Sequence, residues 1–458
     1  MSRTYLIRTF GCQMNAHDSE RLAGLFEHEG MEATNDVEQA DVVLLNTCCI
    51  RENADNKLYG HLGHLKWLKA RRPDMQIAVG GCLAQKDREL IRERAPHVDA
   101  VFGTHNVANA LDLLRRAARE GPVTEILEES DAFPSALPAR RDLPHSAWLT
   151  VQIGCDNRCA FCIVPAVRGR EISRPFDEIV GEAETLATAG TVEITLLGQN
   201  VNSYGRDLTR RRPLFAQLLR AVGAADGIRR VRFTSPHPKD LRPETIAAMA
   251  ETPAVCEHLH LPLQAGSNRT LAAMHRGYTA ERYLEKLAAA RAEVDDLAVT
   301  TDLIVGFPGE TDDDFERTLE VVAEARYDSA YTFVFSPRPG TEAAGRDDCF
   351  VAPEVAADRF ERLAVVVERS ALARHRARVG RTEEVLVEGP SKKNASVVTG
   401  RTRQNKLVHF STGDGTPPRQ GSFARVRITD AAAHFLRGEL VEVTDAPRHR
   451  TRIPVAVG

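Results

Sequence analysis

Three cysteines in a tight group suit the binding of a soft metal centre. Cys155, Cys159 and Cys162 lie in the segment GCDNRCAFC (154–162) with the spacing C-x3-C-x2-C. Three thiolates this close together can hold three corners of an iron–sulfur cluster and leave one iron open to a small molecule. Structural zinc is the alternative, but it normally takes four protein ligands, and no fourth Cys or His follows closely. The spacing therefore favours a [4Fe–4S] cluster with an open site.

A second set of cysteines is dispersed in the sequence but shares one context. Cys12, Cys48 and Cys82 each follow a short apolar run, in TYLIRTF-GC, DVVLLNTC and QIAVGGC. Ligand sites of parallel sheets lie beyond the carboxyl ends of the strands, so three strands can bring these thiolates together at one edge. The alternative is that each is a small buried hydrophobic residue, as free cysteine often is. That alternative does not explain why all three cysteines lie at the same position relative to the end of a strand.

The segment LLNTCCIRE (44–52) contains two adjacent cysteines, which raises the question of whether both bind metal. A disulfide between neighbours is strained, and adjacent side chains on an extended chain point to opposite faces. Cys48 lies three residues past Leu45, as Cys82 lies three past Val79, so Cys48 is the expected ligand. We expect Cys49 to face away, so that removing the Cys48 thiol, but not that of Cys49, abolishes the second cluster.

The alternation of elements predicts an α/β chain of three domains and a linker. In residues 1–118, strand-like runs alternate with helical patterns, which indicates a parallel sheet. Residues 119–146 contain four prolines and an acidic cluster and are interpreted as a linker. Residues 147–372 contain six strand-like runs, most of them separated by helical stretches such as 270–294. They predict a partial (β/α)6 barrel with its chemistry on the loops after the strands.

The third domain, residues 376–445, is predicted to be a small β-barrel of the OB type, because short strands alternate with turn residues. Its charge differs from that of the rest of the chain. Residues 376–458 carry 15 Lys and Arg against 8 Asp and Glu, whereas the whole chain has a net charge of −4. A basic barrel on an acidic body suggests nucleic-acid binding. An ordinary solvated surface is the alternative.

The composition limits where the chain can act. Hydrophobic residues make up 43% and charged residues 27% of the 458 residues, as in soluble globular proteins. No run of about 18 apolar residues is present, so we expect no contact with a membrane. The N-terminus, MSRTYLIRTF, lacks the features of a secretory signal. We therefore expect a cytoplasmic protein, in which nine reduced cysteines serve metal binding or catalysis.

Motifs in a fixed order make the chain resemble the methylthiotransferases of the radical S-adenosylmethionine (SAM) superfamily. A C-x3-C-x2-C loop with Phe161 before its last cysteine, opening a partial barrel, is typical of the superfamily. A preceding three-cysteine domain and a following basic barrel, the TRAM domain, are typical of the methylthiotransferases. The motifs span nearly the whole chain and are GCQMN (11–15), NTCCIRE (46–52), GGC (80–82), VPAVRGREISRP (164–175), LLGQNVNSYG (196–205), LPLQAGS (261–267) and IVGFPGET (304–311). Cys49 and the pair Ala166-Val167 depart from the usual pattern.

The resemblance implies a reaction and its cofactors. It is closest for the branch that attaches a methylthio group to carbon 2 of N(6)-isopentenyladenosine at position 37 of tRNA, next to the anticodon. Each cysteine group would hold a [4Fe–4S] cluster, with SAM as radical source and methyl donor. An aromatic C–H has no acidic proton, so a radical must activate it, and a base in a single-stranded loop can be splayed out for this chemistry. The implied partners are this tRNA and an electron donor such as a flavodoxin or ferredoxin, and we expect a monomer.

The resemblance also suggests contacts beyond the cluster ligands, where no further catalytic residue is assigned. The candidates close the second, fourth and fifth barrel strands, although each could be a turn residue satisfying its own loop. For SAM they are Gly198, Gln199, Asn200, Gln264, Ser267 and Gly306. The candidates for phosphate contacts, which give affinity rather than sequence choice, are Lys392, Lys393, Arg401, Arg403 and Lys406.

Three alternatives are also compatible with the sequence. Another branch of the family methylthiolates an aspartate of a ribosomal protein, and a third acts on threonylcarbamoyl-adenosine in tRNA. GCQMN and the basic terminal domain favour the isopentenyladenosine branch. A non-catalytic iron–sulfur sensor that binds RNA belongs to another class, and formation of 5′-deoxyadenosine from SAM by the reduced protein would exclude it.

Overall fold

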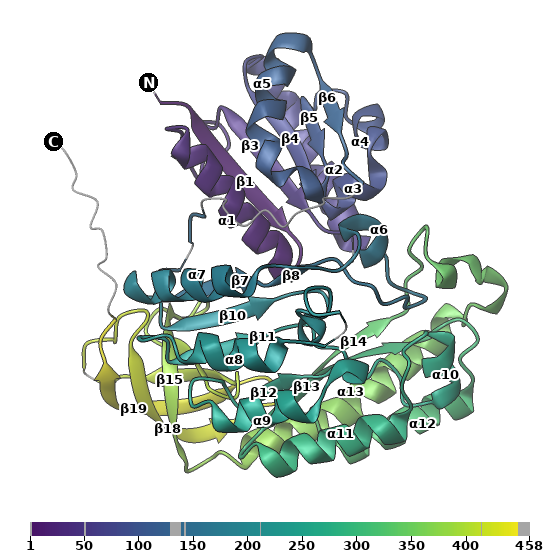
Figure 1. Ribbon diagram of the computed structural model, residues 1–458, viewed down its shortest axis with the longest axis vertical. Coiled ribbons are helices and arrows are strands. Elements are labelled where there is room, and N and C mark those ends of the chain that lie inside the picture. Colours follow the sequence, from purple (N-terminus) through teal and green to yellow (C-terminus); the bar gives the residue numbers. More distant parts are fainter. Residues whose placement is uncertain are drawn as a thin grey trace.

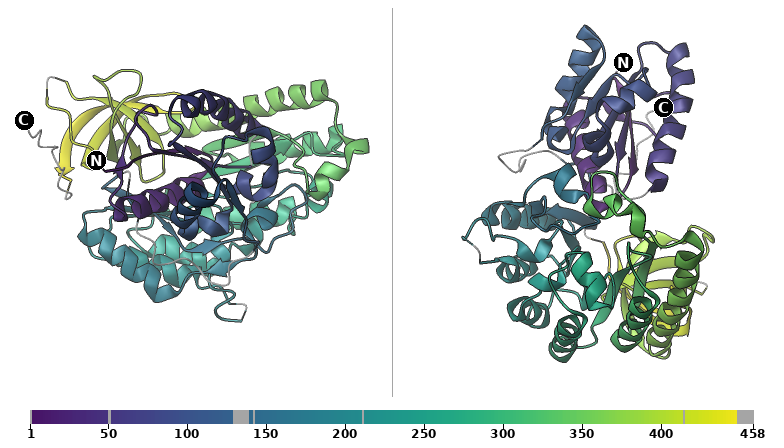
Figure 2. Two further views of the ribbon diagram at one scale, coloured as in Figure 1. Left: turned by 90° about the horizontal axis from the view of Figure 1, so that it is seen from above. Right: turned by 90° about the vertical axis from the view of Figure 1, so that its right-hand side faces the viewer.

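The three domains are arranged with the N-terminal domain above the barrel domain and the C-terminal barrel beside it (Figures 1 and 2). The computed structural model describes residues 2–49, 52–128, 139–141, 143–210, 212–413 and 415–447, without the side chains of 52–56. No helix in these ranges is long and apolar enough to cross a membrane.

The N-terminal domain is a parallel sheet covered by helices on both faces. Its strands, in spatial order, are β2 (Glu32–Ala33), β1 (Thr4–Phe10), β3 (Val42–Thr47), β4 (Gln76–Gly81), β5 (Ala100–Phe102) and β6 (Val123–Glu125). Alternate strand residues pack against opposite layers, as the period of two requires. One layer is α1 (Gln13–His28) and α5 (Ala110–Glu120); the other is α2 (Glu52–Arg71), α3 (Cys82–Asp87) and α4 (Glu89–Arg94).

This domain extends further along the chain than its sequence predicts. Strand β6 lies inside the expected linker of 119–146, yet it pairs in parallel with β5 and completes the sheet. The boundary at residue 118 is therefore wrong, because a three-residue strand at a sheet edge gives too short a hydrophobic pattern to detect. Residues 129–138, which contain part of the proposed linker, lie outside the described residues.

The second domain confirms the partial barrel. Its strands form two parallel three-stranded sheets, β11-β10-β7 and β12-β13-β14. The strands are β7 (Ser146–Thr150), β10 (Glu193–Leu197), β11 (Arg230–Phe233), β12 (His258–His260), β13 (Ala298–Val305) and β14 (Ser329–Val334). The main helices around them are α7 (Phe176–Thr188), α8 (Phe215–Gly223), α9 (Pro243–Glu251), α10 (Asn268–Ala273), α11 (Ala280–Glu293), α12 (Asp312–Ala325) and α13 (Pro353–Arg376).

The helical stretch expected over 270–294 is two helices. Helix α10 ends at Ala273, and His275 and Gly277 adopt positive φ angles of 57° and 70°. Thr279 then caps α11 by accepting a hydrogen bond from the Arg282 amide. The break exposes a loop on the same side as the cysteine loop, and Arg276 in this loop reaches a cysteine there.

The third domain is a closed five-stranded barrel, as predicted. Strands β15 (Thr382–Pro390), β16 (Val398–Thr402), β17 (Leu407–Ser411), β19 (Leu436–Asp445) and β18 (Phe423–Ala431) follow one another around it. Its core is a small apolar cluster of alternating strand residues, including Val385, Val408 and Phe410. Closure leaves no open sheet edge.

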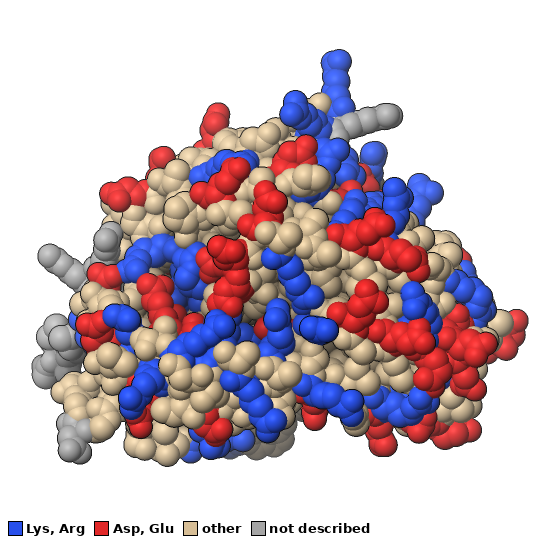
Figure 3. Space-filling view, turned by 90° about the horizontal axis from the view of Figure 1, so that it is seen from below, with Lys and Arg blue, Asp and Glu red and all other residues tan. Residues whose placement is uncertain are grey.

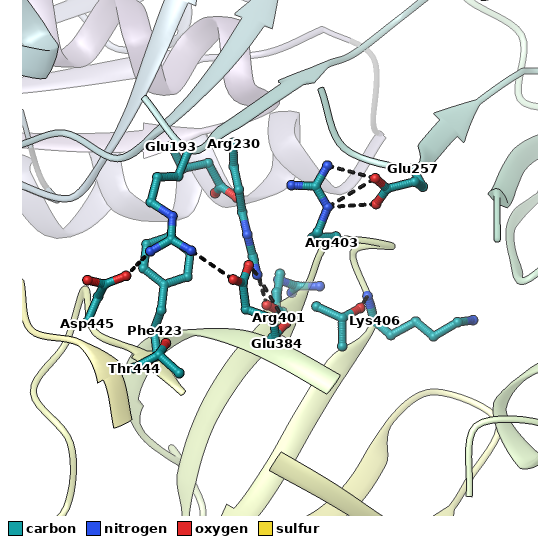
Figure 4. A network of polar contacts seen from close by, with 12 residues as sticks. Glu193, Arg230, Glu257, Glu384, Arg401, Arg403, Lys406, Phe423, Thr444 and Asp445 are labelled. Atoms are coloured by element: carbon teal, nitrogen blue, oxygen red, sulfur yellow. Dashed lines mark hydrogen bonds and ion pairs between the residues drawn. The ribbon is translucent and has the colours of Figure 1, made fainter. Parts of the chain in front are cut away.

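Buried arginines join this barrel to the amino ends of the barrel strands of the second domain (Figure 4). The fully buried Arg230, first residue of β11, donates to the carbonyls of Arg401 (2.8 Å) and Glu384 (3.1 Å). Arg232 donates to the carbonyls of Arg403 (2.7 Å) and Thr402 (2.8 Å). These charge-assisted bonds fix the two domains against each other without using the carboxyl ends of the strands.

Two residues expected to contact RNA belong to this interface instead. Lys406 is buried and donates to Asp328 at 2.6 Å, and Arg403 forms a bidentate pair with Glu257, the residue before β12. Lys406 and Arg403 are therefore removed from the predicted phosphate contacts. The sequence could not show this, because their burial depends on how the domains dock.

Polar contacts also join the N-terminal domain to the second domain through α1. Asp18 pairs with the buried Arg168 at 2.8 Å. Arg141 bridges Glu20 (2.8 Å) and Glu182 (2.6 Å). Helix α1 begins directly after Cys12, the first strand-end cysteine. The helix that carries the contacts between the N-terminal and second domains therefore starts at this cysteine.

The buried pair Lys406–Asp328 yields a stability prediction. Asp328→Asn leaves the Lys406 ammonium buried without its counter-charge, and we expect the free energy of unfolding to fall by about 3 kcal/mol. Glu442→Gln breaks the solvent-exposed pair with Arg425 and should change it by less than about 1 kcal/mol. Urea denaturation measures both. If both substitutions lowered the free energy of unfolding by the same small amount, the domain interface would not depend on the Lys406–Asp328 pair.

Candidate functional site

The predicted meeting of Cys12, Cys48 and Cys82 is present at one edge of the sheet. Strands β1, β3 and β4 are neighbours, and their last residues are in register: Phe10 pairs with Thr47, and Thr47 pairs with Gly81. Each cysteine follows within two residues of its strand end. The similar offsets, two or three residues past the last apolar strand residue, thus become adjacent positions in space.

Hydrogen bonds and close packing hold these three strand ends together. The Asn15 amide donates to Asn46 Oδ1 (3.1 Å) and to the Thr47 carbonyl (3.2 Å), and Asn46 Nδ2 donates to the Asn15 carbonyl (2.8 Å). Gly81, with φ of +96°, lies where a Cβ would be 2.4 Å from Asn46 Oδ1. A side chain at Gly11 would likewise meet the Cys48 Cβ at 2.7 Å. The GC and GGC motifs therefore reflect close approach of the backbones.

The thiols at this edge form two hydrogen-bonded pairs. Cys12 pairs with Cys48, and this bond lowers the pKa of Cys12 to about 5 against the effect of burial. Cys82 pairs with Cys49. This hydrogen bond lowers the pKa of Cys82 to about 7 and raises the pKa of Cys49. Thiolates are the form that binds metals, so two of the four are poised for ligation.

The expectation that Cys49 faces away is wrong. Its side chain is buried, belongs to the same apolar cluster as Cys82, and hydrogen bonds to that thiol. Strand β3 ends at Thr47, so the alternation of an extended chain no longer governs the two residues that follow. The sequence shows two adjacent cysteines, but it does not show which way the chain turns after Thr47, and that turn determines where Cys49 points.

A cation from the second domain lies beside these thiols. Arg168, at the end of α6 (Val164–Arg168), is buried and paired with Asp18. Burial alone would lower the pKa of Arg168, but Asp18 and the nearby Cys82 and Cys12 hold it well above its ordinary value. The motif VPAVRG thus supplies a fixed positive charge to the three-strand edge.

The second cysteine group occupies the loop after β8 (Gln152–Ile153), as predicted. Cys155, Cys159 and Cys162 are half-buried there. The loop is tied down by backbone bonds from Cys155 N to the Gly169 carbonyl (3.2 Å) and from Ala160 N to the Met274 carbonyl (3.1 Å). Burial raises the pKa of Cys155 to about 11 and that of Cys162 to about 12, so binding of a metal must drive their deprotonation.

Arg276 is a further residue of this group that sequence reasoning missed. Its guanidinium donates to Cys159 Sγ at 3.3 Å and to the Tyr278 hydroxyl at 3.1 Å. Arg276 is buried, and burial alone would lower its pKa. Tyr278 and Cys159 outweigh this effect and raise the pKa of Arg276. The sequence feature that could have identified Arg276 is its place before Gly277, in the turn that divides the helical stretch of 270–294.

The two cysteine groups are close to each other through α6. Ile163, directly after Cys162, and Val167 pack in the same apolar cluster as Cys49 and Cys82. A single short helix therefore separates one group from the other (Figure 1).

Both donor sets consist of cysteine thiols, and thiolates are the ligands of iron–sulfur clusters. In the ranges that the structure describes, no group of three or more His, Cys, Asp and Glu side chains lies close enough to hold one metal ion. A four-iron cluster needs its thiolates at separate corners, wider apart than the ligands of one ion. Soft thiolates with adjacent arginines suit such a cluster, since hydrogen bonds and charge near the sulfurs tune it.

The residues after β10 fit the binding of a polar small molecule such as SAM. Both amide atoms of Gln199, and Oδ1 of Asn200, are buried with no hydrogen-bond partner among the described residues. Gly198 precedes them at a point where a Cβ would lie 3.3 Å from Gln152 Oε1, which is also buried and unpaired among these residues. Buried polar atoms need partners, so a ligand that supplies them is expected here.

Two other SAM candidates also have structural roles. Ser267 caps α10 and donates its hydroxyl to Asp314 at 2.5 Å. Gly306 has a φ of +72° and packs against Ala356 of α13. Gln264 also has a positive φ, of 72°, and its carbonyl accepts from the Ile304 amide (2.9 Å). These roles do not test contact with SAM, so Ser267, Gly306 and Gln264 all stay predictions.

Gln152 and Glu171 were not predicted and complete this polar group. Gln152 donates to Ser203 Oγ (3.2 Å), and Ser203 donates to Glu171 Oε1 (2.7 Å). Burial raises the pKa of Glu171 to about 7. Glu171 lies in the quoted motif GREISRP, but only the folded chain shows that it turns toward the strand end.

A cavity of about 490 Å³ lies where the three domains meet. Gln13, next to Cys12, lines it from the N-terminal domain, and Arg401 and Lys406 line it from the C-terminal barrel. Its wall in the second domain is formed by alternate residues of three strands and includes His258, His260, Thr300, Asp302, Ser329, Tyr331 and Phe333. Tyr331 is 60% exposed, so an aromatic face is available in the cavity.

Comparison with known proteins accounts for all three domains. Family models match residues 4–103 (uncharacterized protein family UPF0004), 149–322 (radical SAM superfamily) and 376–441 (TRAM domain). A tRNA-2-methylthio-N(6)-dimethylallyladenosine synthase of Acidothermus cellulolyticus is 54% identical over 444 residues, covering 96% of this chain and 88% of that protein. One of Nocardioides sp. is 53% identical over 447 residues, covering 96% and 90%.

The chain belongs to this family of synthases. Solved structures are similar in fold. The radical SAM methyltransferase TsrM from Kitasatospora setae, with cobalamin and a [4Fe-4S] cluster bound, has a TM-score of 0.54 at 15% identity over 75% of this chain and 77% of that chain. The cobalamin-dependent radical SAM enzyme OxsB has a TM-score of 0.54 at 14% identity over 79% and 56%.

The contact of Arg276 with Cys159 predicts an effect on the reduction potential. A positive donor near a cluster sulfur favours the reduced, more negative state. We expect Arg276→Gln to lower the potential of the cluster on Cys155, Cys159 and Cys162 by roughly 60 mV, a tenfold change in the one-electron equilibrium. Redox titration followed by electron paramagnetic resonance (EPR) measures this in a chain that lacks the strand-end cysteines.

Arg269→Gln is the matched control, because Arg269 lies on α10 and bonds Asp314 rather than a cysteine. Its potential should equal that of the parent. Equal potentials for all three chains would exclude an electrostatic role for Arg276.

Proposed function

We propose that this chain methylthiolates carbon 2 of N(6)-isopentenyladenosine at position 37 of tRNA. The single observation that carries the proposal is the proximity of two cysteine groups across α6, in a chain about half identical to synthases named for this product. One group would hold the cluster that, with SAM, supplies radical chemistry. The other would hold the auxiliary cluster near the sulfur to be inserted.

The protein's own residues have three tasks in this reaction. Gln199, Asn200 and Gln152 would orient SAM through their unpaired polar atoms. Arg276 and Arg168 hold positive charge next to the two thiolate groups, which offsets the negative charge that thiolates bring to a cluster. The domain interface along α1 keeps the two groups at a fixed separation.

The three-domain cavity is the proposed site of the target base. It reaches from Gln13, beside the auxiliary cysteines, along the barrel strands, so a base inside it would lie next to this group. Tyr331 and Phe333 offer aromatic faces for stacking, and Asp302 and His260 offer polar partners for the base edge. A splayed-out, isopentenylated adenine has both aromatic and apolar surface to bury there.

The phosphate backbone would be bound by residues outside the domain interface. Lys392 and Lys393 are exposed and form no ion pair with the described residues, so they remain candidates. Arg401 is paired with Glu388 but lines the cavity. In Figure 3, acidic side chains gather at the right-hand end, whereas Lys and Arg form patches over the centre and left. RNA would avoid the acidic end.

The remaining partners follow from the chemistry. Reduction of the cluster requires an electron donor, and we propose a flavodoxin or ferredoxin. We propose that the chain acts as a monomer in the cytoplasm, where its tRNA substrate is found.

Nucleoside mass spectrometry of tRNA tests the proposal. In a strain that lacks this gene, isopentenyladenosine should accumulate and its methylthio derivative should be absent. The wild-type gene should restore the derivative, and the Cys159→Ala gene should not, because a cluster ligand is lost. Persistence of the derivative in the deletion strain would refute this substrate. Loss of methylthiolated threonylcarbamoyl-adenosine, or of a modified ribosomal aspartate, would assign the chain to another branch.

The cavity generates a separate prediction. Tyr331→Ala should raise the Kd for an anticodon stem-loop RNA carrying isopentenyladenosine about tenfold, since base–aromatic stacking contributes about 1–3 kcal/mol. Tyr331→Phe keeps the ring and should bind as the wild type does. Fluorescence anisotropy measures all three affinities. Equal affinities of the Ala and Phe variants would place the base elsewhere.

A further inference from the structure

The strand-end site contains four thiols, one more than an open three-cysteine cluster site needs. Cys49 is buried beside Cys82, and Cys48 is buried beside Cys12. The two pairs are near each other, because Cys48 and Cys49 are adjacent in the chain and Cys12 and Cys82 follow strands on either side of β3.

The strand order explains why the middle strand can serve both sides. Strand β3 lies between β1 and β4, so the chain leaving Thr47 passes between the two flanking cysteines. Cys48 reaches the cysteine after β1, and Cys49 reaches the cysteine after β4. Both thiols are buried, and Cys49 packs in one apolar cluster with Ile163, which precedes α6, and with Val167 of α6.

A merely structural role for Cys49 accounts less well for this arrangement. A small apolar residue would fill the same space among Leu45, Val79 and Leu83. A fourth thiol instead adds another sulfur donor next to three others. Four cysteine thiolates are the usual ligand set of a [4Fe–4S] cluster.

We propose that Cys49 is a fourth, exchangeable protein ligand of the auxiliary cluster. The inference rests on the proposed function for the existence of that cluster. With Cys12, Cys48 and Cys82 bound, Cys49 would ligate the remaining iron in the resting protein and protect it. It would also replace Cys48 when that thiol is missing.

The exchange is a balanced ligand substitution. When Cys49 binds, its S–H bond breaks, the proton passes to solvent, and an Fe–S bond forms. An incoming sulfide or methanethiolate breaks that bond and forms its own bond to the same iron, and Cys49 regains a proton. No electron is transferred, so no oxidant or reductant is required.

Iron counts in five full-length chains test the proposal. The parent carries Cys155→Ala, Cys159→Ala and Cys162→Ala, so that only the auxiliary site can be filled by anaerobic reconstitution with iron and sulfide. We expect about four irons per chain in the parent, and about four again after adding Cys49→Ala or Cys48→Ala, because three thiols remain. Adding both substitutions should leave fewer than about one iron. Adding Cys48→Ala with Cys256→Ala, a buried cysteine elsewhere, should again retain about four.

The outcomes separate this inference from the proposed function. A parent without iron would refute the auxiliary cluster itself and the inference with it. A filled parent whose Cys48→Ala chain is as empty as the double variant would refute only the role of Cys49. A second readout is the EPR spectrum of the reduced parent during titration with methanethiol. Cys49→Ala should respond at an at least tenfold lower concentration, and identical titrations would refute an exchangeable Cys49 ligand.

Discussion

The alignment of three parallel strand ends is the constraint on which the rest of the site depends. Phe10, Thr47 and Gly81 end in register, and the amide hydrogen bonds between Asn15 and Asn46 hold the ends together. Because a sheet fixes neighbouring strands at a constant spacing, the residues that follow cannot separate. Thiols remote in sequence thereby become one site. Helix α1 starts from the same edge and carries the contacts that orient the whole domain.

Buried positive charge joins the parts of this molecule. Arg168 couples the α1 carboxylate of Asp18 to the strand-end thiols, and Arg276 couples the broken helix to the cysteine loop. At the opposite end of the barrel, Arg230 and Arg232 hold the TRAM domain by its backbone carbonyls. Buried charges of this kind are costly unless paired, so removing one partner of such a contact would destabilise the arrangement of its neighbours. The strand carboxyl ends remain free for chemistry.

Much of this architecture could be predicted from the sequence, and the exceptions have physical reasons. The strand-end position of Cys12, Cys48 and Cys82 followed from apolar runs that end two or three residues before each cysteine, since parallel strands end at one edge. The position of Cys49 did not, because its direction is set after the strand has ended. Lys406 is a basic residue of the kind that contacts phosphate, but the docking of the C-terminal barrel on the second domain buries it. Arg276 required knowledge of how two distant loops meet.

The central claim is that the two cysteine groups form one composite site across α6. EPR spectroscopy of the fully reconstituted, reduced chain tests this claim most directly, because two paramagnetic clusters at close range alter each other's spectra. The account predicts a spectrum that differs from the sum of two single-cluster variants, one lacking Cys155, Cys159 and Cys162 and the other lacking Cys12, Cys48, Cys49 and Cys82. A spectrum equal to that sum would contradict it.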